Sequence, residues 1–331
     1  MLRERRWELS LLAVLLVFPL AVQDAYFRHL MILVLLWITI GTGWNLLAGY
    51  TGQVSFGTAA FFGVGAYAAG LLSHHLELSA WWGLALGGPL AVLVAFPFGW
   101  ISFPLRGAYF ALGSLALGEI MRLLATVWES LTEGMVGLLI MQTFVSKVPY
   151  YYIALGLALG SILVMEMVTR SRLGYYFVSI REDQDAAASI GIDTTKFKMV
   201  SLSLHAFLTG TAGALYMNYM GFIDPQVVFS LSDISIMAIL VVIVGGVGTI
   251  MGPVVGAFVM VAVQEIFRSG GFGGLKALTQ AVGGEVLPVL TKYITQAHVL
   301  AFGVLVVVVI MTLPNGIVGD WSRIRRALRR G

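Results

Sequence analysis

Long apolar runs of helical length recur along this chain, and they constrain its fold more than any other feature. The runs cover residues 9–22, 30–48, 55–73, 80–103, 107–127, 150–169, 199–220, 234–251, 253–267 and 298–313. A helix needs about 20 apolar residues to cross a bilayer, and continuous runs argue against the alternating pattern of a β-barrel. The sequence therefore predicts an all-α polytopic membrane protein with about ten transmembrane or re-entrant helices.

Charged residues are too few to cover the surface of a soluble fold. They make up 11% of the 331 residues, and the mean hydropathy is +0.90, whereas about 25% charged residues is usual in soluble domains. No hydrophilic block is long enough to fold alone, so we expect a single transmembrane domain over residues 1–331. The absence of cysteine excludes disulfides and thiolate metal sites.

The first apolar run has some features of a signal peptide, because three arginines precede it. However, Glu4 and Glu8 are unusual in such a region, and no small-x-small cleavage site follows. We therefore interpret residues 9–22 as a first membrane span.

The distribution of lysine and arginine predicts an orientation. With ten spans both termini share one side, which then receives fourteen of the 20 lysines and arginines, against six on the other side. Positive residues favour the cytoplasmic side, so we expect cytoplasmic termini, a cytoplasmic loop at residues 179–195 and a basic cytoplasmic tail at 320–331. Residues 268–297 are expected to form an interfacial segment on the opposite face. If residues 55–73 form a re-entrant segment, the number of spans becomes odd and the two termini no longer share one side.

Glycines interrupt the third apolar run. Residues 49, 52, 57, 63 and 65 are glycine, and each weakens a regular helix by about 1 kcal/mol relative to alanine. One interpretation is a broken helix along a translocation path, since irregular backbone in a bilayer is tolerated only against protein or a watery cavity. The candidate polar groups for that path are Asn45, Gln53, Ser55 and Thr58. The other interpretation is a tight helix crossing built on small residues, and both can hold.

A second glycine cluster lies near the end of the chain. Gly248, Gly252 and Gly256 are spaced by four, so we expect them on one helix face, and Pro253 predicts a break or a helix start. Like the first cluster, it has a glycine turn followed by small residues between two apolar runs, as a distant internal repeat would. We therefore add Gly245, Gly248 and Gly252 to the candidate path.

Few ionisable residues fall inside the apolar runs. Glu119 and Arg122 are three residues apart, as are Glu265 and Arg268, so each pair can share a helix face. A charge at mid-bilayer costs about 2.5–3.5 kcal/mol, so it marks function or pairing, although snorkelling lowers the cost near span ends. Glu119 is the pair member that we add to the candidate path. His205 is expected to be a packed polar or interfacial residue.

Motifs of soluble enzymes are absent from the sequence. It contains no phosphate-binding loop and no zinc-protease motif, and its glycine-rich runs do not follow strands. We therefore expect no catalytic residues, no cofactor and no metal site. The basic tail is expected to lie at lipid headgroups rather than to bind nucleic acid.

A charged stretch stands out at the middle of the chain. Seven of the 37 charged residues lie between residues 181 and 198. Acidic residues at 182, 183 and 185, three alanines at 186–188 and Gly191 predict a short helix with a glycine stop. Thr194 or Thr195 is expected to cap the next long helix. Such a helix either serves as a peg for a partner's groove or lies at the interface without a partner.

Four stretches identify a family resemblance. They are residues 49–67 (GYTGQVSFG and AAFFGVGAY), 106–120 (RGAYFAL and GEI), 170–192 (RSRLG and IREDQDAAASIGI) and 245–257 (GGVG and GPVVGA). With them the sequence resembles, over about residues 30–313, the permeases of branched-chain amino acid ABC importers, in particular their M-type (LivM-like) subunits.

The resemblance implies a type II-importer-like permease fold and a coupling helix that docks onto an ATPase. On this view the ATPase-coupling residues are Arg181, Glu182, Asp183, Ala187, Ala188 and Gly191. The implied partners are two ATPase subunits, which hydrolyse the ATP, a second homologous permease and an extracytoplasmic amino-acid-binding protein. The implied location is a bacterial or archaeal plasma membrane, and the implied cargo is a branched-chain or related hydrophobic amino acid.

The sequence departs from the family pattern at two places. Residues 132–138 stand where the family more often has a Gly-Gly-Ser-x-Gly-like run, and Tyr175 and Tyr176 replace a more usual Arg-Ala. Two alternatives stay open: a permease for urea or short-chain amides, and an ion-coupled secondary transporter. The second would need buried carboxylates, for which Glu119 and Glu265 are the only candidates.

Overall fold

The computed structural model describes most of the chain in two compact units. The described residues are 15–104, 107–268, 303, 307, 311, 312 and 315–319. Met1–Ile239 form the first unit and Leu240–Gly331 the second, and each is described by itself. The predicted interfacial segment after residue 268, the basic tail, Arg106 and most of the last apolar run lie outside the described residues. The single domain over residues 1–331 stays a prediction.

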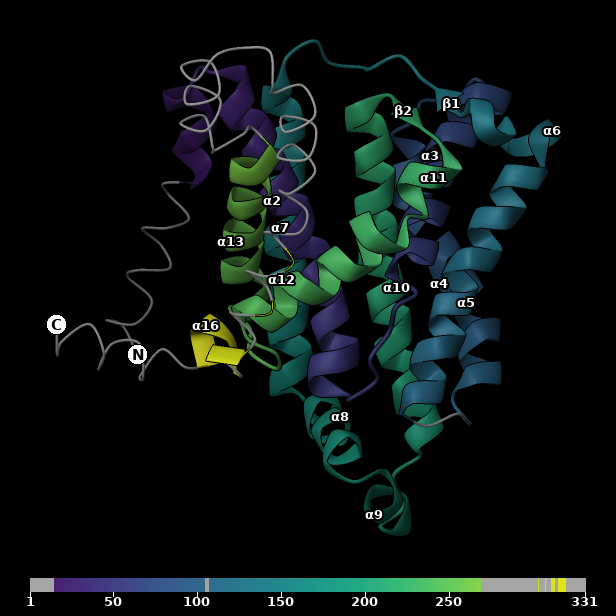
Figure 1. Ribbon diagram of the computed structural model, residues 1–331, viewed down its shortest axis with the longest axis vertical. Coiled ribbons are helices and arrows are strands. Elements are labelled where there is room, and N and C mark those ends of the chain that lie inside the picture. The colour runs from purple at the N-terminus through teal and green to yellow at the C-terminus, as the bar shows by residue number, and fades with distance from the viewer. Residues whose placement is uncertain are drawn as a thin grey trace, which may run out of the picture. The chain divides into compact units, whose positions relative to one another are not determined.

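The first unit is built almost entirely of helices, as predicted. Its longer elements are α2 (Ala25–Trp44), α3 (Thr58–Leu76), α4 (Trp82–Ser102), α5 (Ala108–Val127), α7 (Lys147–Arg170), α8 (Arg172–Glu182) and α10 (Thr194–Met220). The shorter ones are η1 (Asn45–Tyr50), α6 (Glu129–Thr132), η2 (Gly134–Val136), β1 (Leu138–Leu139), α9 (Gln184–Ser189), β2 (Phe222–Ile223), α11 (Pro225–Val228) and η3 (Leu231–Ile236). The all-α fold class is thereby confirmed (Figure 1).

Within the described residues, five segments are long and apolar enough to cross a membrane. They are Ala25–Tyr50, Trp82–Ser102, Ala108–Val127, Lys147–Arg170 and Pro225–Gly245. The helices α3 and α10 are absent from this set, although α10 is 27 residues long. In α10 buried polar side chains such as Lys198 and His205 lower the mean hydropathy, and in α3 His74 and His75 of the last turn do so. The predicted count of about ten spans stays a prediction.

The helix α10 lies at the centre of the first unit, packed against α3, α4 and α2. Glycines let the helices approach closely: a Cβ added at Gly65 would collide with the carbonyl oxygen of Gly210, and one at Gly213 with that of Phe62. Such contacts are typical of small-residue packing between helices in membranes. The interpretation as a tight helix crossing is therefore correct for Gly65.

The third apolar run crosses the first unit from end to end. Residues 51–57 are not helical, and a Cβ at Gly52 would lie 3.0 Å from Arg181 Cγ, at the end of α8. At the other end of the run, His75 Nε2 lies 2.8 Å from the carbonyl oxygen of Leu131, in α6. Figure 1 shows α8 and α6 at opposite ends of this unit. The run therefore begins in a short non-helical stretch, residues 51–57, and continues as the 19-residue helix α3, and it does not turn back within the unit.

A small antiparallel sheet closes the α6 end of the first unit. Leu138 pairs with Ile223 and Leu139 with Phe222, and the backbone N–H of Ile140 donates to the Gly221 oxygen at 2.8 Å. Residues 132–138, where the sequence departs from the family pattern, run from the end of α6 through η2 to the first residue of β1. The sheet ties the segment after α5 to the end of α10.

The second unit contains a tight turn between two helices. It includes the end of α12 (Met237–Gly245), α13 (Gly252–Arg268) and α16 (Gly316–Gly319). A Cβ at Gly256 would collide with the carbonyl oxygen of Val241, so α12 and α13 cross closely. Pro253 lies in the first turn of α13, as predicted. The expectation that Gly248 shares a helix face with Gly252 and Gly256 is wrong, because Gly248 lies in the turn with φ +71°.

Candidate functional site

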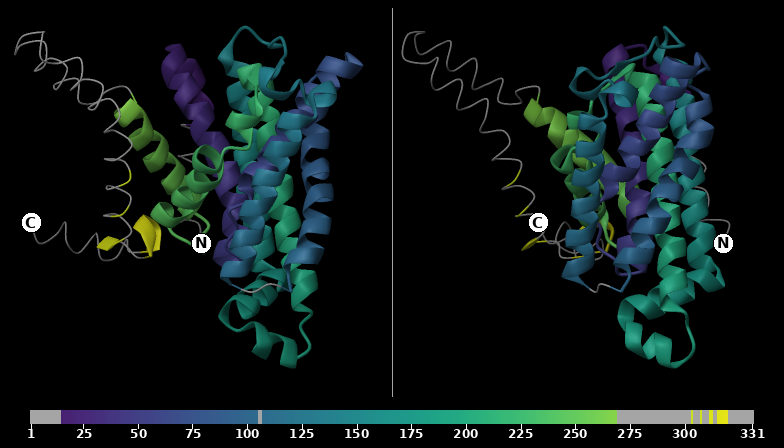
Figure 2. Two further views of the ribbon diagram at one scale, coloured as in Figure 1. Left: turned by 45° about the vertical axis from the view of Figure 1, so that its right-hand side comes forward. Right: turned by 90° about the vertical axis from the view of Figure 1, so that its right-hand side faces the viewer.

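The charged stretch forms the short helix α9, which projects beyond the helix ends of the first unit (Figures 1 and 2). Asp183 caps it: the Asp183 Oδ1 accepts hydrogen bonds from the backbone N–H groups of Asp185, at 2.8 Å, and Ala186, at 3.0 Å. These two bonds lower the pKa of the Asp183 carboxyl, and the bond from Ala186 has the larger effect. The cap therefore stays charged near neutral pH. Gly191 stops the segment with φ +90°, where other residues are strained. The predicted short helix and its glycine stop are confirmed.

Two local expectations for this stretch are wrong. Glu182 is the last residue of α8 rather than the start of the short helix. Neither Thr194 nor Thr195 caps α10; instead the Asp193 Oδ1 accepts the backbone N–H of Lys196 at 3.0 Å. An aspartate is a stronger cap acceptor than a neutral hydroxyl, and it lies one residue before the two threonines.

The six candidate coupling residues differ in what they offer to a partner. Glu182, Asp183, Ala188 and Gly191 are exposed, and Ile190 beside them is 77% exposed. A Cβ at Gly191 would meet no atom within 4 Å. Ala187, in contrast, is buried against its own chain. The accessible face of α9 is therefore small and mixed in polarity, and Ala187 lies on its packed side.

Arg181 points back from α8 into the first unit. Its Nη1 donates to the carbonyl oxygen of Gly49 at 2.9 Å, and its Nη2 lies 2.6 Å from Glu182 Oε1. Gly49 belongs to η1, a π-helical turn at the end of α2. The Arg181 side chain also covers Gly52, which has φ +75°. One guanidinium thus connects α8 to the start of the non-helical residues 51–57, the broken segment.

Lys198 makes a second connection between α9 and the helix bundle. The residue is only 1% exposed, and its Nζ donates to Gln184 Oε1 at 2.5 Å. The ammonium also lies 6.0 Å from the centre of the Phe103 ring. A buried lysine requires such partners because an unpaired charge is costly away from water. Lys198 therefore attaches the first turn of α9 to α10.

Hydroxyl groups hold the other side of the broken segment. Thr51 Oγ1 lies 2.9 Å from Ser201 Oγ, and both hydroxyls are within 3.1 Å of the Leu46 carbonyl oxygen. The backbone N–H of Phe56 donates to Ser114 Oγ at 2.8 Å. These side chains replace the hydrogen bonds that the backbone loses where the helix stops.

Three of the predicted path residues are packed inside the first unit. Asn45, Ser55 and Thr58 are buried, and only Gln53 is partly exposed. Thr58 Oγ1 lies 3.4 Å from Nε2 of His205. That histidine is fully buried, in agreement with its interpretation as a packed polar residue. The structure brings these residues together around the broken segment.

The remaining path candidates lie elsewhere. Glu119 pairs with Arg122 on an exposed face of α5, with Oε2 2.9 Å from Nε, so the predicted ion pair is confirmed. Gly245 and Gly252 form the close crossing in the second unit, and Gly248 its turn. The Arg268 side chain lies outside the described residues, so its pairing with Glu265 stays a prediction.

Sequence reasoning missed several residues of this site. Two of them, Asp193 and Lys198, belong to the charged stretch. Lys198 could have been found, because a lysine at the start of a long apolar helix is a signal for a buried ion-pair or hydrogen-bond partner. Thr51 and Ser201 gave no such signal, because small hydroxyl residues are common in membrane helices.

Comparison with known proteins places the chain in a family. Residues 26–313 match the family described as the branched-chain amino acid transport system / permease component. The chain belongs to this family. It is therefore a helical, multi-pass membrane protein of the permease class.

The related proteins agree with this assignment. The chain is 27% identical to the high-affinity branched-chain amino acid transport system permease protein LivM of Salmonella typhimurium, over 71% of this chain and 62% of that protein. It is 22% identical to LivH of the same organism, over 85% and 90%. It is 26% identical to the autoinducer 2 import system permease protein LsrC of Yersinia enterocolitica, over 58% and 55%. The chain thus spans about three fifths of the LivM protein, and no solved structure gives a significant match.

Proposed function

We propose that this chain is the transmembrane permease subunit of an ATP-binding cassette importer for branched-chain or related hydrophobic amino acids. It forms part of the translocation path and couples through α9 to separate ATPase subunits that hydrolyse the ATP. The family membership supports the class of transporter. The names of the LivM and LivH relatives support the class of cargo and a second, homologous permease in the complex.

The observation that carries the proposal is the way α9 is attached. The helix is short, capped and exposed on one face, as a docking peg must be. Arg181 of α8, the helix before α9, donates to Gly49 of η1. Lys198 of α10, the helix after α9, donates to Gln184 of α9. A force applied to α9 therefore acts on α10 directly and on η1 through Arg181 of α8.

The broken segment is the part of the first unit best suited to move in response. Residues 51–57 lack the hydrogen bonds of a regular helix and are held instead by side chains such as Ser201 and Ser114. Exchanging a few side-chain hydrogen bonds costs less than breaking a helix, so this segment can shift while α3 and α10 keep their crossing. Gln53, which is partly exposed, is the path candidate nearest to the cargo, whereas Asn45, Ser55 and Thr58 shape the segment from within.

The orientation of the chain is part of the proposal. The bias of lysine and arginine supports a cytoplasmic α9 end and cytoplasmic termini. An extracytoplasmic binding protein then delivers the amino acid at the opposite end, where α6, β1 and β2 lie in Figure 1. The membrane is a bacterial or archaeal plasma membrane.

The test is reconstitution of the chain with its ATPase subunits, second permease and binding protein in proteoliposomes. We expect uptake of labelled leucine that depends on ATP, and Ala188→Glu on the exposed face of α9 to abolish capture of the ATPase. Met141→Glu is the matched control, because Met141 is 92% exposed at the opposite end. Uptake that persists without any ATPase subunit would show an ion-coupled transporter instead. Uptake of urea or short-chain amides in place of leucine would change the cargo but not the coupling.

A further inference from the structure

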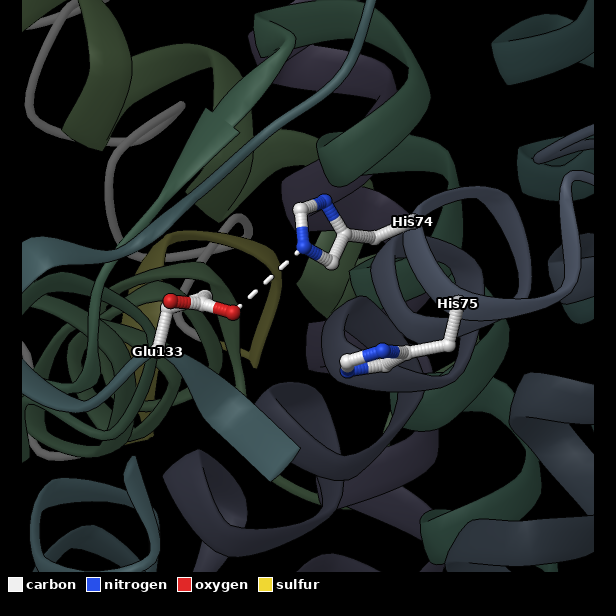
Figure 3. Close-up of side chains that lie close together, drawn as sticks. All are labelled: His74, His75 and Glu133. Atoms are coloured by element: carbon white, nitrogen blue, oxygen red, sulfur yellow. Dashed lines mark ion pairs between the residues drawn. The ribbon is translucent and has the colours of Figure 1, made fainter. Parts of the chain in front are cut away.

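Two histidines and a glutamate meet at the end of the first unit opposite to α9. His74 and His75 lie in the last turn of α3, and Glu133 follows α6. Figure 3 shows the three side chains turned toward one another across the gap between these elements. One potential ligand atom from each residue lies within 4.8 Å of the other two. Among the described residues this is the one group of its kind.

The distances suit a metal ion. His74 Nε2 lies 3.4 Å from Glu133 Oε1. Two ligands of a tetrahedral zinc ion, each bonded at about 2.1 Å, are about 3.4 Å apart. The pair can therefore accept an ion between its nitrogen and oxygen with little rearrangement.

A hydrogen bond to the backbone fixes the tautomer of the second histidine. His75 Nε2 lies 2.8 Å from the carbonyl oxygen of Leu131, which can only accept a hydrogen bond. Nε2 therefore carries the proton, and Nδ1 keeps the lone pair that binds a metal. Histidine ligands in metal sites commonly donate their other ring N–H to a backbone carbonyl in this way.

The backbone is strained at the same place. Glu133 has φ +58° and Glu77, directly after the last turn of α3, has φ +52°. They are the two residues other than glycine with positive φ in the described part of the chain. Such conformations are strained and cluster at ligand-binding and active sites. At Glu133 the unusual turn accompanies a carboxylate directed at His74.

We propose that His74, His75 and Glu133 bind a divalent transition-metal ion of the zinc class, with water as the remaining ligand. Imidazole and carboxylate ligands suit this class of ion. The His74 and Glu133 side chains are 41% and 42% exposed, so an ion can enter from solution. The bound ion joins the end of α3 to α6 and thereby restrains the helix that follows the broken segment. The binding itself does not depend on the proposed transport function.

The test uses the purified full-length chain in detergent, freed of any affinity tag and treated with a chelator. Titration with Zn²⁺ in a calorimeter is expected to give one ion per chain. The variants His74→Ala, His75→Ala and Glu133→Gln are each expected to weaken binding at least tenfold, as loss of a metal ligand does. Glu129→Gln, in the short helix α6 that precedes Glu133, is the matched control and should bind as the parent chain does. Co²⁺ should give visible absorption bands of a site with nitrogen and oxygen ligands.

Two results would overturn the proposal. One is the absence of stoichiometric Zn²⁺ binding, which would leave His74 and Glu133 as an ion pair only. The other is unchanged affinity in all three variants, which would place the bound ion elsewhere on the chain. Misfolding of a variant is recognised by its elution profile, and the pair His74→Gln and Glu133→Asn then serves as a second set. Both replacements keep polar side chains, and asparagine tolerates the left-handed turn at position 133.

Discussion

The central helix α3 and the peripheral helix α5 are nearly equal in length, with 19 and 20 residues, yet they are built differently. Most of α3 is buried, and its glycine at position 65 touches backbone of α10. In α5 most apolar side chains face outward, and a Cβ at Gly118 would meet nothing within 4 Å. The comparison shows that the glycines of the two helices have different surroundings. In α3 Gly65 permits a close helix crossing, whereas Gly118 in α5 is buried but has no atom within contact distance of an added Cβ.

The largest effect is expected from Gly65→Val. The new side chain would collide with backbone at Gly210, which cannot rotate away, so α3 and α10 would have to separate. We expect a loss of more than about 3 kcal/mol in the free energy of unfolding, since overpacking against backbone lies at the upper end of such effects. Thermal unfolding in detergent measures it. A variant as stable as the parent would show that the crossing is looser than described.

A smaller loss is expected from Ser201→Ala. This change removes the buried hydroxyl that accepts a hydrogen bond from Thr51 and donates one to the Leu46 carbonyl oxygen. Leaving buried polar groups with fewer partners costs about 1–3 kcal/mol. Ser189→Ala, at an exposed position of α9, is the control and should leave the unfolding temperature unchanged. Equal effects of the two variants would contradict a special role of the hydroxyl groups around the broken segment.

The ion pair on α5 should matter little when both members are removed together. Exposed pairs contribute at most about 1 kcal/mol. In lipid, however, a single charge left without its partner is unfavourable. We therefore expect Glu119→Gln and Arg122→Gln each to lower stability in proteoliposomes more than the double variant does. If the double variant is the least stable, the pair has a role beyond neutralising its own charges.

The smallest effect is expected from Gly156→Ala in α7. Gly156 is exposed, and a Cβ there would meet nothing within 4 Å. Because alanine favours a helix over glycine by up to about 1 kcal/mol, the variant should be as stable as the parent or slightly more stable. A clear loss of stability in the isolated chain would mean that the outer face of α7 is packed. A loss seen only in the assembled transporter would place a partner subunit there.

Much of the fold followed from the sequence because local signals and burial agree there. Apolar runs gave the helices, Pro253 marked a helix start, and the charged stretch gave α9 with its glycine stop. The spacing of Glu119 and Arg122 predicted their pairing, because residues three apart always share a helix face.

The features that the sequence did not reveal depend on contacts between distant segments. Arg181 reaches back to Gly49, and no local pattern encodes that contact. Gly248 has helical spacing, yet its place in a turn is set by how α12 and α13 cross. Glu133 meets His74 only because α6 folds over the end of α3. Such placements arise from tertiary packing, which periodicity does not describe.

The central claim is that force on α9 reaches the broken segment through Arg181. The direct measurement compares Arg181→Gln with the parent chain in proteoliposomes that contain the complete transporter, and records the amount of leucine imported per ATP hydrolysed. We predict that the variant keeps its ATPase subunits and hydrolyses ATP but imports at least about tenfold less leucine per ATP, because the bond to Gly49 is lost. An unchanged ratio of import to hydrolysis, with the ATPase still bound, would contradict the account.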